Sequence, residues 1–167
     1  QLSYIVLGIA ILSPLSTAGA LYHLVAHAFM KITLFMCAGA IFVTTHKKDI
    51  SEMVGLGRRM PITMSAFTLA SLGIAGFPFF VGFVSKANII MGALKTGQLL
   101  FGATLIVSAI LALTYLMPVV LIAFKKEPVN PEFGTYGESS KMMLIPLLIT
   151  ATFSIILGVA PNFGLHL

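Results

Sequence analysis

The sequence predicts an all-α fold, a polytopic bundle of transmembrane helices, and three observations support this prediction. Hydrophobic residues make up 58% of the 167 residues, whereas charged residues make up only 9%. The mean hydropathy is +1.04, and a soluble domain of this length could not bury so much apolar surface. Most basic residues lie in short polar connections, where they would anchor helix ends at lipid headgroups. We therefore treat residues 1–167 as one transmembrane region.

The first apolar stretches predict two helices joined by a tight turn. Residues 1–12 are too short to cross a bilayer, which needs about 20 residues, so we interpret them as part of a helix in a fragment of a longer protein. Residues 13–16 form a turn around a proline, and Ser16 or Thr17 is a candidate N-cap. Residues 17–45 form a long helix, which must tilt or bend to fit the hydrocarbon core.

A helix break is expected in the middle of the chain. Pro61 suits the first turn of a helix that covers residues 61–76. The run Gly-Phe-Pro-Phe-Phe-Val-Gly at residues 76–82 then interrupts the apolar pattern. Residues 79–95 follow as a short or discontinuous helix. We expect one broken element here rather than two full membrane spans.

Two further helices complete the expected bundle. Residues 98–124 form an apolar helix in which Pro118 predicts a kink. Residues 142–160 form the last span, which ends before a proline.

The two polar connections carry much of the charge. Counting three passes between residues 46–60 and 125–141 places these basic loops on opposite faces of the membrane, so the positive-inside rule leaves the orientation open. The carboxylates of the second connection are expected to be solvated. They are Glu127, Glu132 and Glu138.

Three basic side chains form a stripe along one face of the helix expected over residues 17–45. His23, His27 and Lys31 recur at four-residue spacing, so they lie on one helix face at a rise of about 6 Å each. A lysine at the centre of a membrane helix costs about 2.5–3.5 kcal/mol on insertion scales and usually faces a protein interior or a water-filled path. The stripe therefore predicts a proton relay. The alternative is a pair of packed histidines bonded to neighbouring helices.

Lys86 is the second buried cation that the sequence predicts. It follows the helix break, where unpaired backbone groups and water can meet, so we interpret it as a proton-accepting lysine. Ser85 and Asn88 are expected to help solvate it. The alternative is that Lys86 snorkels to the membrane interface.

Other site chemistries find little support. The pair His23 and His27 has the spacing of a zinc pair, but Leu24 stands where the HExxH motif has glutamate, and a third ligand is missing nearby. Cys37 is the single cysteine, which excludes an internal disulfide. Phosphate loops, dinucleotide fingerprints, cysteine clusters and a basic, aromatic-interleaved surface are also missing. We therefore expect no metal, no cofactor and no nucleic acid partner.

The motifs of the chain occur together in a known family. The segment His23-Leu-Val-Ala-His27-Ala-Phe-Met-Lys31, continued to Gly39, resembles the pattern H-x-x-x-H-A-x-x-K-x-x-L-F-x-x-A-G of antiporter-like membrane subunits. Gly57-Arg-Arg-Met-Pro61 and Gly82-Phe-Val-Ser-Lys86 continue the resemblance in the same order. Such subunits occur in respiratory complex I, in membrane-bound hydrogenases and in Mrp-type cation/proton antiporters.

The resemblance implies a fold and a set of roles. Family members contain two inverted repeats, each with a half-channel around a broken helix, and this chain is similar to their C-terminal half. By this likeness Lys31 matches the central-axis lysine, and His23 and His27 match its flanking histidines. Lys86 matches the ionisable residue of the second broken helix.

The chain also departs from the family pattern. Ala26 stands where many members have asparagine, and Phe79 stands where many have a second proline. The first repeat, with its Glu–Lys pair, is not part of the sequence. Lysine rather than glutamate at position 86 is most similar to the D-type component of Mrp antiporters.

These observations lead to a functional hypothesis with two alternatives. We expect a subunit of a multisubunit monovalent cation (Na⁺)/proton antiporter, a multi-pass protein of a prokaryotic plasma membrane that works with other membrane subunits. The alternative is a proton-pumping subunit of an NADH-quinone oxidoreductase or a membrane-bound hydrogenase. Such a subunit has no catalytic site of its own, so the sequence does not decide whether the complex is an enzyme. The third possibility is a membrane scaffold without transport, in which leucine could replace Lys31 and Lys86 without harm.

Overall fold

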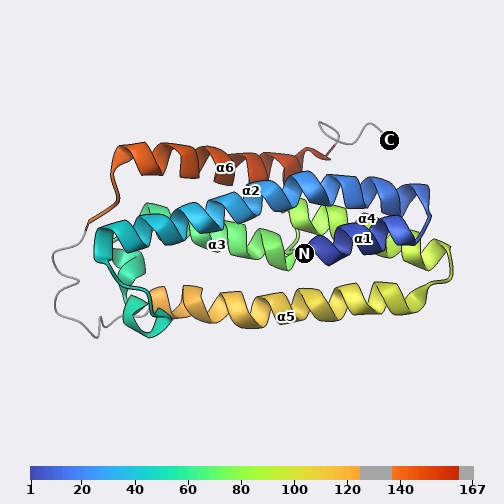
Figure 1. Ribbon diagram of the computed structural model, residues 1–167, viewed down its shortest axis with the longest axis horizontal. Coiled ribbons are helices and arrows are strands. Elements are labelled where there is room, and N and C mark those ends of the chain that lie inside the picture. Colours follow the sequence, from blue (N-terminus) through green and yellow to red (C-terminus); the bar gives the residue numbers. More distant parts are fainter. Residues whose placement is uncertain (125–136, 162–167) are drawn as a thin grey trace.

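The computed structural model describes residues 1–124 and 137–161, which fold into a bundle of α-helices without a strand (Figure 1). Two short 3-10 helices, η1 and η2, lie between the second and third α-helices. The prediction of an all-α transmembrane bundle is confirmed, because three of the helices are long and apolar enough to cross a membrane (α2, α5 and α6). The elements in chain order are α1 (Leu2–Ala10), α2 (Pro14–Thr45), η1 (Ile50–Met53), η2 (Leu56–Arg58), α3 (Pro61–Ala75), α4 (Val81–Lys95), α5 (Leu99–Ala123) and α6 (Lys141–Val159).

Helix α2 starts earlier than the sequence suggested. Ser13 is the N-cap in an extended conformation, and Pro14 occupies the first turn, where its missing N–H group costs nothing. Ser16 lies inside the helix, and its hydroxyl donates a hydrogen bond to the Ser13 carbonyl at 3.0 Å. Helix α5 runs through Pro118, so this proline does not end it.

Helices α3 and α4 together cross the bundle once. Each has 15 residues, which is shorter than the ~20 residues of a full span. Figure 1 shows α3 in one half of the bundle and α4 in the other half, both alongside the long helix α2. The break between them therefore lies in the middle of the bundle, far from either end.

This single crossing changes the topology inferred from the sequence. The α2–α3 connection and the α5–α6 connection are separated by the broken crossing and by α5 alone, so both lie at the same end of the bundle (Figure 1). The Gly55 N–H donates to the Ile122 carbonyl at 3.2 Å, and the Ser139 hydroxyl donates to the Ala40 carbonyl at 3.2 Å. The prediction that the two basic loops lie on opposite faces is therefore wrong. Lys125 and Lys126 lie outside the described residues.

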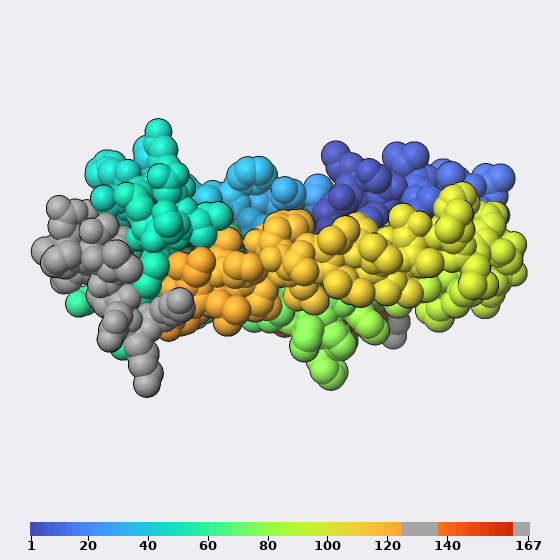
Figure 2. All heavy atoms as spheres, turned by 90° about the horizontal axis from the view of Figure 1, so that it is seen from below, coloured from blue at the N-terminus to red at the C-terminus, as the bar shows by residue number. Residues whose placement is uncertain are grey.

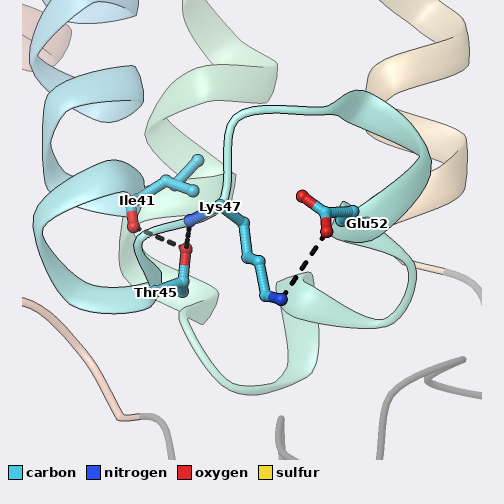
Figure 3. Close-up of polar contacts among 4 residues, drawn as sticks. All are labelled: Ile41, Thr45, Lys47 and Glu52. Carbon is cyan, nitrogen blue, oxygen red and sulfur yellow. Dashed lines mark hydrogen bonds and ion pairs between the residues drawn. The ribbon is translucent and has the colours of Figure 1, made fainter.

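Local hydrogen bonds hold the connection after α2. The Thr45 hydroxyl donates to the Ile41 carbonyl at 2.8 Å and accepts from the Lys47 N–H at 3.3 Å. The Lys47 ammonium then forms an ion pair with Glu52 at 3.6 Å (Figure 3). These contacts turn the chain away from the end of α2 and toward α3.

Glu138 caps the N-terminus of α3. Its carboxylate accepts hydrogen bonds from the Ile62 N–H at 2.5 Å, the Thr63 N–H at 3.4 Å and the Thr63 hydroxyl at 2.8 Å. The first N–H groups of a helix have no partner within it, and a carboxylate also complements the helix dipole there. The expectation that Glu138 is simply solvated is therefore wrong. Glu127 and Glu132 lie outside the described residues.

Helix α5 lies across one face of the molecule. Figure 2 shows it, coloured from yellow to orange, along the length of this face. Four outward side chains near its middle are apolar and 50–57% exposed, as expected for a surface in contact with lipid or with other membrane helices. They are Ile106, Val107, Ile110 and Leu111.

Candidate proton-translocation site

The site is built on the helix break. Helix α3 ends at Gly76, whose φ of 86° is in the left-handed region that glycine tolerates best. The last carbonyl groups of a helix have no partner within it. A turn around Pro78 follows, closed by a hydrogen bond from the Phe80 N–H to the Phe77 carbonyl at 3.2 Å, and α4 begins at Val81. The break thus presents free backbone acceptors in the interior of the bundle.

Lys86 supplies hydrogen bonds to these acceptors. Its ammonium lies 2.6 Å from the Ile74 carbonyl oxygen and 3.2 Å from the Ala75 carbonyl oxygen. The side chain is only 4% exposed, so the alternative that Lys86 snorkels to the interface does not apply to this fold. A cation at this place also complements the negative end of the α3 dipole.

Lys86 has no carboxylate partner among the residues that the structure describes. The single ion pair found in those residues joins Lys47 to Glu52 at the end of the bundle. The partners of Lys86 are instead neutral carbonyl groups and the ring of Tyr4, whose centroid lies 5.2 Å from the ammonium. No counter-charge in the described part of the chain therefore fixes Lys86 in its charged form.

His23 is fully buried beside this lysine. Its Nδ1 atom lies 2.8 Å from the hydroxyl oxygen of Ser85, the residue before Lys86, and its Nε2 atom lies 3.1 Å from the side-chain oxygen of Gln1. Gln1 in turn donates to the Ile74 carbonyl at 3.3 Å, the same oxygen that Lys86 contacts. A continuous set of hydrogen bonds therefore runs from His23 on α2 to Lys86 on α4.

Tyr4 on α1 contacts both of these residues. Its ring centroid lies 5.5 Å from the His23 ring, and it also contacts the Lys86 ammonium. The Tyr4 hydroxyl forms a hydrogen bond with the Ser108 hydroxyl of α5. Tyr4 thus ties α1, α2, α4 and α5 together at the site.

His27 and Lys31 extend the site along α2. The rings of His23 and His27 are stacked with their centroids 6.2 Å apart. His27 and Lys31 line a cavity of about 400 Å³ next to Gln1, and the Lys31 ammonium lies 5.3 Å from the centroid of the Phe35 ring. Both side chains are half-buried, so they are more accessible than His23.

The structure brings the four predicted site residues into one region, but it changes some of their partners. Ser85 bonds to His23, whereas the sequence suggested that it solvates Lys86. Gln1 and Tyr4 were missed, because a single polar side chain in an apolar helix gives no signal of what it faces across the bundle. The role of the Ile74 carbonyl as a hydrogen-bond acceptor was missed for the same reason. The nearby glycines and proline predicted only that some backbone groups at the break would be unpaired.

Helix α6 supports the break from outside. A Cβ atom at Gly158 would overlap the Phe79 carbonyl oxygen and would lie 2.5 Å from the Val81 nitrogen. Only a glycine allows the backbone of α6 to approach so closely. Within the described residues, no group of three or more His, Cys, Asp or Glu side chains is placed to hold a metal ion.

This fold and site define a class of protein: a polytopic membrane subunit built around a broken helix with buried basic residues. Comparison with known families places the chain within that class. Residues 1–114 match the model of the NADH:quinone oxidoreductase/Mrp antiporter membrane family. The chain belongs to this family, as its motifs predicted.

Two relatives represent the two branches of the family. The chain is 36% identical over 169 residues to the N-type component of the NADH-quinone oxidoreductase of Desulforudis audaxviator, covering 95% of this chain and 34% of the relative. It is 31% identical over 160 residues to the D-type component of the Na(+)/H(+) antiporter of Alkalihalophilus pseudofirmus, covering 96% of this chain and 32% of the relative. The chain thus spans about a third of the length of these relatives.

Solved structures show the same fold. A chain of the Mrp complex from Dietzia sp. matches with a TM-score of 0.85 at 23% identity, over 96% of this chain and 38% of that one. A chain of respiratory complex I from Thermus thermophilus matches with a TM-score of 0.85 at 22% identity, over 96% of this chain and 33% of that one. The chain therefore has the fold of part of a membrane subunit of the Mrp antiporter or complex I type.

Proposed function

We propose that this chain translocates protons as part of a subunit of a multisubunit monovalent cation (Na⁺)/proton antiporter. In this proposal Lys86, His23, His27 and Lys31 carry the proton. The observation that supports it most directly is the environment of Lys86, which is buried at a helix break and bonded to neutral carbonyl groups. A buried ionisable residue without a counter-charge is typical of proton and ion paths in membranes.

The proposed path runs along α2 and then crosses to α4. A proton that enters the cavity beside Lys31 meets His27 one helical turn away, and then His23, whose ring is stacked on that of His27. Histidine exchanges protons near neutral pH, which suits it to this role. From His23 the proton passes to Lys86 through water, because the Ile74 carbonyl that Gln1 and Lys86 share only accepts hydrogen bonds and cannot relay a proton. Repulsion between like charges in the low-dielectric interior favours release from one site when another is filled.

The relatives support a second candidate function. The chain is 36% identical to a component of an NADH-quinone oxidoreductase and 31% identical to a component of an antiporter. In the second candidate, the same four residues move protons, but electron transfer in other subunits supplies the energy. Bacterial relatives of both kinds support a prokaryotic plasma membrane and a multisubunit assembly.

The test uses the full-length complex in an antiporter-deficient host. Inside-out vesicles would be given a pH gradient, and its collapse on addition of Na⁺ would be followed with a fluorescent pH indicator. Three forms would be compared: wild type, Lys86→Ala and the control Lys95→Ala. Lys95 is an exposed lysine at the end of the same helix, so its loss changes the net charge equally but leaves the site intact.

The antiporter proposal expects Na⁺-dependent collapse in the wild type and in Lys95→Ala but not in Lys86→Ala, with normal assembly in all three. Wild-type rates in Lys86→Ala would contradict the role of Lys86. A wild-type complex without Na⁺-dependent collapse that builds a proton gradient on oxidation of an electron donor would favour the redox-driven pump.

A further inference from the structure

The Ile74 carbonyl fixes the orientation of the Gln1 amide, and this amide in turn fixes which hydrogen His23 carries. The nitrogen of this amide donates to the Ile74 carbonyl at 3.3 Å, and a carbonyl oxygen can only accept. The amide oxygen must then face His23, where it lies 3.1 Å from Nε2. Because that oxygen is also only an acceptor, Nε2 of His23 carries a hydrogen.

The other side of His23 has a partner that can change its role. The Ser85 hydroxyl lies 2.8 Å from Nδ1 of His23 and 3.1 Å from the Gly82 carbonyl oxygen. A hydroxyl has one hydrogen and can also accept. When the hydrogen points to Gly82, the Ser85 oxygen accepts a hydrogen bond from a protonated Nδ1. When it points to His23, it donates to an unprotonated Nδ1.

We propose that Ser85 is a positioning residue that lets His23 gain and lose one proton by rotation of a single hydroxyl group. In the charged state both ring nitrogens of His23 donate, to Gln1 and to Ser85. In the neutral state Nε2 still donates to Gln1, and Ser85 donates to Nδ1. The proton that leaves Nδ1 passes to water in the bundle. The Ser85 hydroxyl then rotates and donates its hydrogen to Nδ1, so the hydrogen bond between the two residues is kept with its direction reversed. This inference rests on the proposed function only for the use of His23 in transport.

Both states keep the polar atoms of His23 paired, which matters because the ring is fully buried. The groups that face it from the neighbouring helices are few. The ring of Tyr4 comes from α1, the ring of His27 lies 6.2 Å away on α2 itself, and the ammonium of Lys86 on α4 contacts the same Tyr4 ring. None of these is a carboxylate that would hold His23 in the charged form.

The test reads the protons of His23 directly. The full-length complex would be labelled with ¹⁵N-histidine, and the ring nitrogen signals would be followed by solid-state NMR from pH 5 to pH 9, with His23→Gln to assign the His23 signals. In the wild type, the neutral form should carry its hydrogen on Nε2, and the doubly protonated form should appear as the pH falls.

Ser85→Ala and Ser154→Ala would then be compared. Ser154 is also buried, but its hydroxyl has no partner in the structure, so it controls for the loss of a buried serine. Ser85→Ala should lower the ratio of doubly protonated to neutral His23 about tenfold at a given pH, because hydrogen bonds made by charged groups are the stronger ones. Ser154→Ala should leave this ratio unchanged.

An unchanged ratio in Ser85→Ala, or a neutral form with its hydrogen on Nδ1, would overturn the inference. Vesicle transport provides a separate readout, in which Ser85→Ala should change the pH profile of proton transport and Ser154→Ala should not. If the wild-type complex moved no protons, the proposed function would fail, while the NMR ratio would still decide the role of Ser85.

Discussion

The ammonium of Lys86 lies 2.6 Å from the carbonyl oxygen of Ile74, so a side chain of α4 caps the end of α3 across the helix break. The same carbonyl also accepts a hydrogen bond from Gln1, which contacts His23. The break is therefore both the place where α3 and α4 are joined and the place where the two buried basic residues meet. Changes at this point should affect stability and transport together.

Replacing Lys86 by methionine should lower the stability of the bundle and stop proton transport. Methionine keeps most of the alkyl chain but leaves the Ala75 carbonyl without its lysine donor and the Ile74 carbonyl with Gln1 alone. Loss of the donor to a buried acceptor costs about 1–3 kcal/mol. Unfolding of the purified complex in denaturing detergent and proton transport in vesicles measure the two effects. The matched change Lys95→Met at the exposed end of α4 should alter neither. A Lys86→Met protein that is as stable as wild type and still transports would contradict both the capping role and the transport role of Lys86.

Gly158→Ala should destabilise the packing of α6 against the break. The added Cβ atom would overlap the Phe79 carbonyl oxygen, so the helix must shift, at a cost of about 1–3 kcal/mol or more. Gly39→Ala is the control, because a Cβ atom at Gly39 in α2 has nothing within 4 Å. It should be neutral or stabilise the helix by about 0.5–1 kcal/mol. Equal stability of the two variants would contradict this account of Gly158.

Phe79 occupies a strained position in the break. Its φ of 73° is in the left-handed region, although its side chain is 77% exposed and loses little contact when removed. Phe79→Gly should therefore stabilise the protein by about 1 kcal/mol, since a non-glycine residue costs about 1–2 kcal/mol in this conformation. Phe79→Pro should destabilise it, because proline fixes φ near −65°. Thermal unfolding of the two variants checks the prediction, and a more stable proline variant would show that the break adopts another backbone path.

Glu138→Gln should weaken the attachment of the segment before α6 to the start of α3. The amide can replace only part of the three hydrogen bonds that the carboxylate accepts from Ile62 and Thr63, and the interaction with the helix dipole is lost. We expect a loss of about 1 kcal/mol in unfolding free energy, the usual size for a helix cap. Glu52→Gln removes a carboxylate from the ion pair with Lys47 at the same end of the bundle and should cost less, as surface ion pairs do. Denaturation of the purified complex measures both losses, and a larger loss in Glu52→Gln would contradict the capping role of Glu138.

The positions of the basic residues predict the orientation of the chain in the membrane. Among the described residues, five Lys or Arg side chains lie at or near the end of the bundle that holds η1 and η2, whereas Lys95 lies at the opposite end (Figure 1). The five are Lys47, Lys48, Arg58, Arg59 and Lys141, the first residue of α6. The positive-inside rule then places the η1–η2 end in the cytoplasm.

Labelling of single cysteines with a membrane-impermeant maleimide tests this orientation. The background would be Cys37→Ala, because Cys37 is the one cysteine in this sequence, together with alanine at any further cysteine of the full-length complex. Asp49→Cys should react only in inside-out vesicles, and Thr96→Cys should react in intact cells. The reverse pattern would show that the opposite end faces the cytoplasm.

The sequence was a good guide to features that depend on local chemistry. Apolar stretches predicted the helices, the glycines and proline of residues 76–82 predicted the break, and four-residue spacing placed His23, His27 and Lys31 on one face of α2. The start of α2 differed because Ser13 and Pro14 form a cap and first turn that a hydropathy pattern does not detect. The predicted membrane face of the second basic loop was wrong, because α3 and α4 were counted as two crossings of the membrane instead of one.

The sequence by itself determined the class of the protein, since burial of so many apolar side chains requires a membrane, and it determined which ionisable residues lie within that membrane. The tertiary structure decided which groups these residues contact. His23 meets Ser85, Tyr4 meets Ser108, and Lys86 meets the carbonyl of Ile74. The physical reason is range: helix formation and hydropathy act over neighbouring residues, whereas the partners of a buried polar group come from other helices and are fixed only when the whole bundle packs.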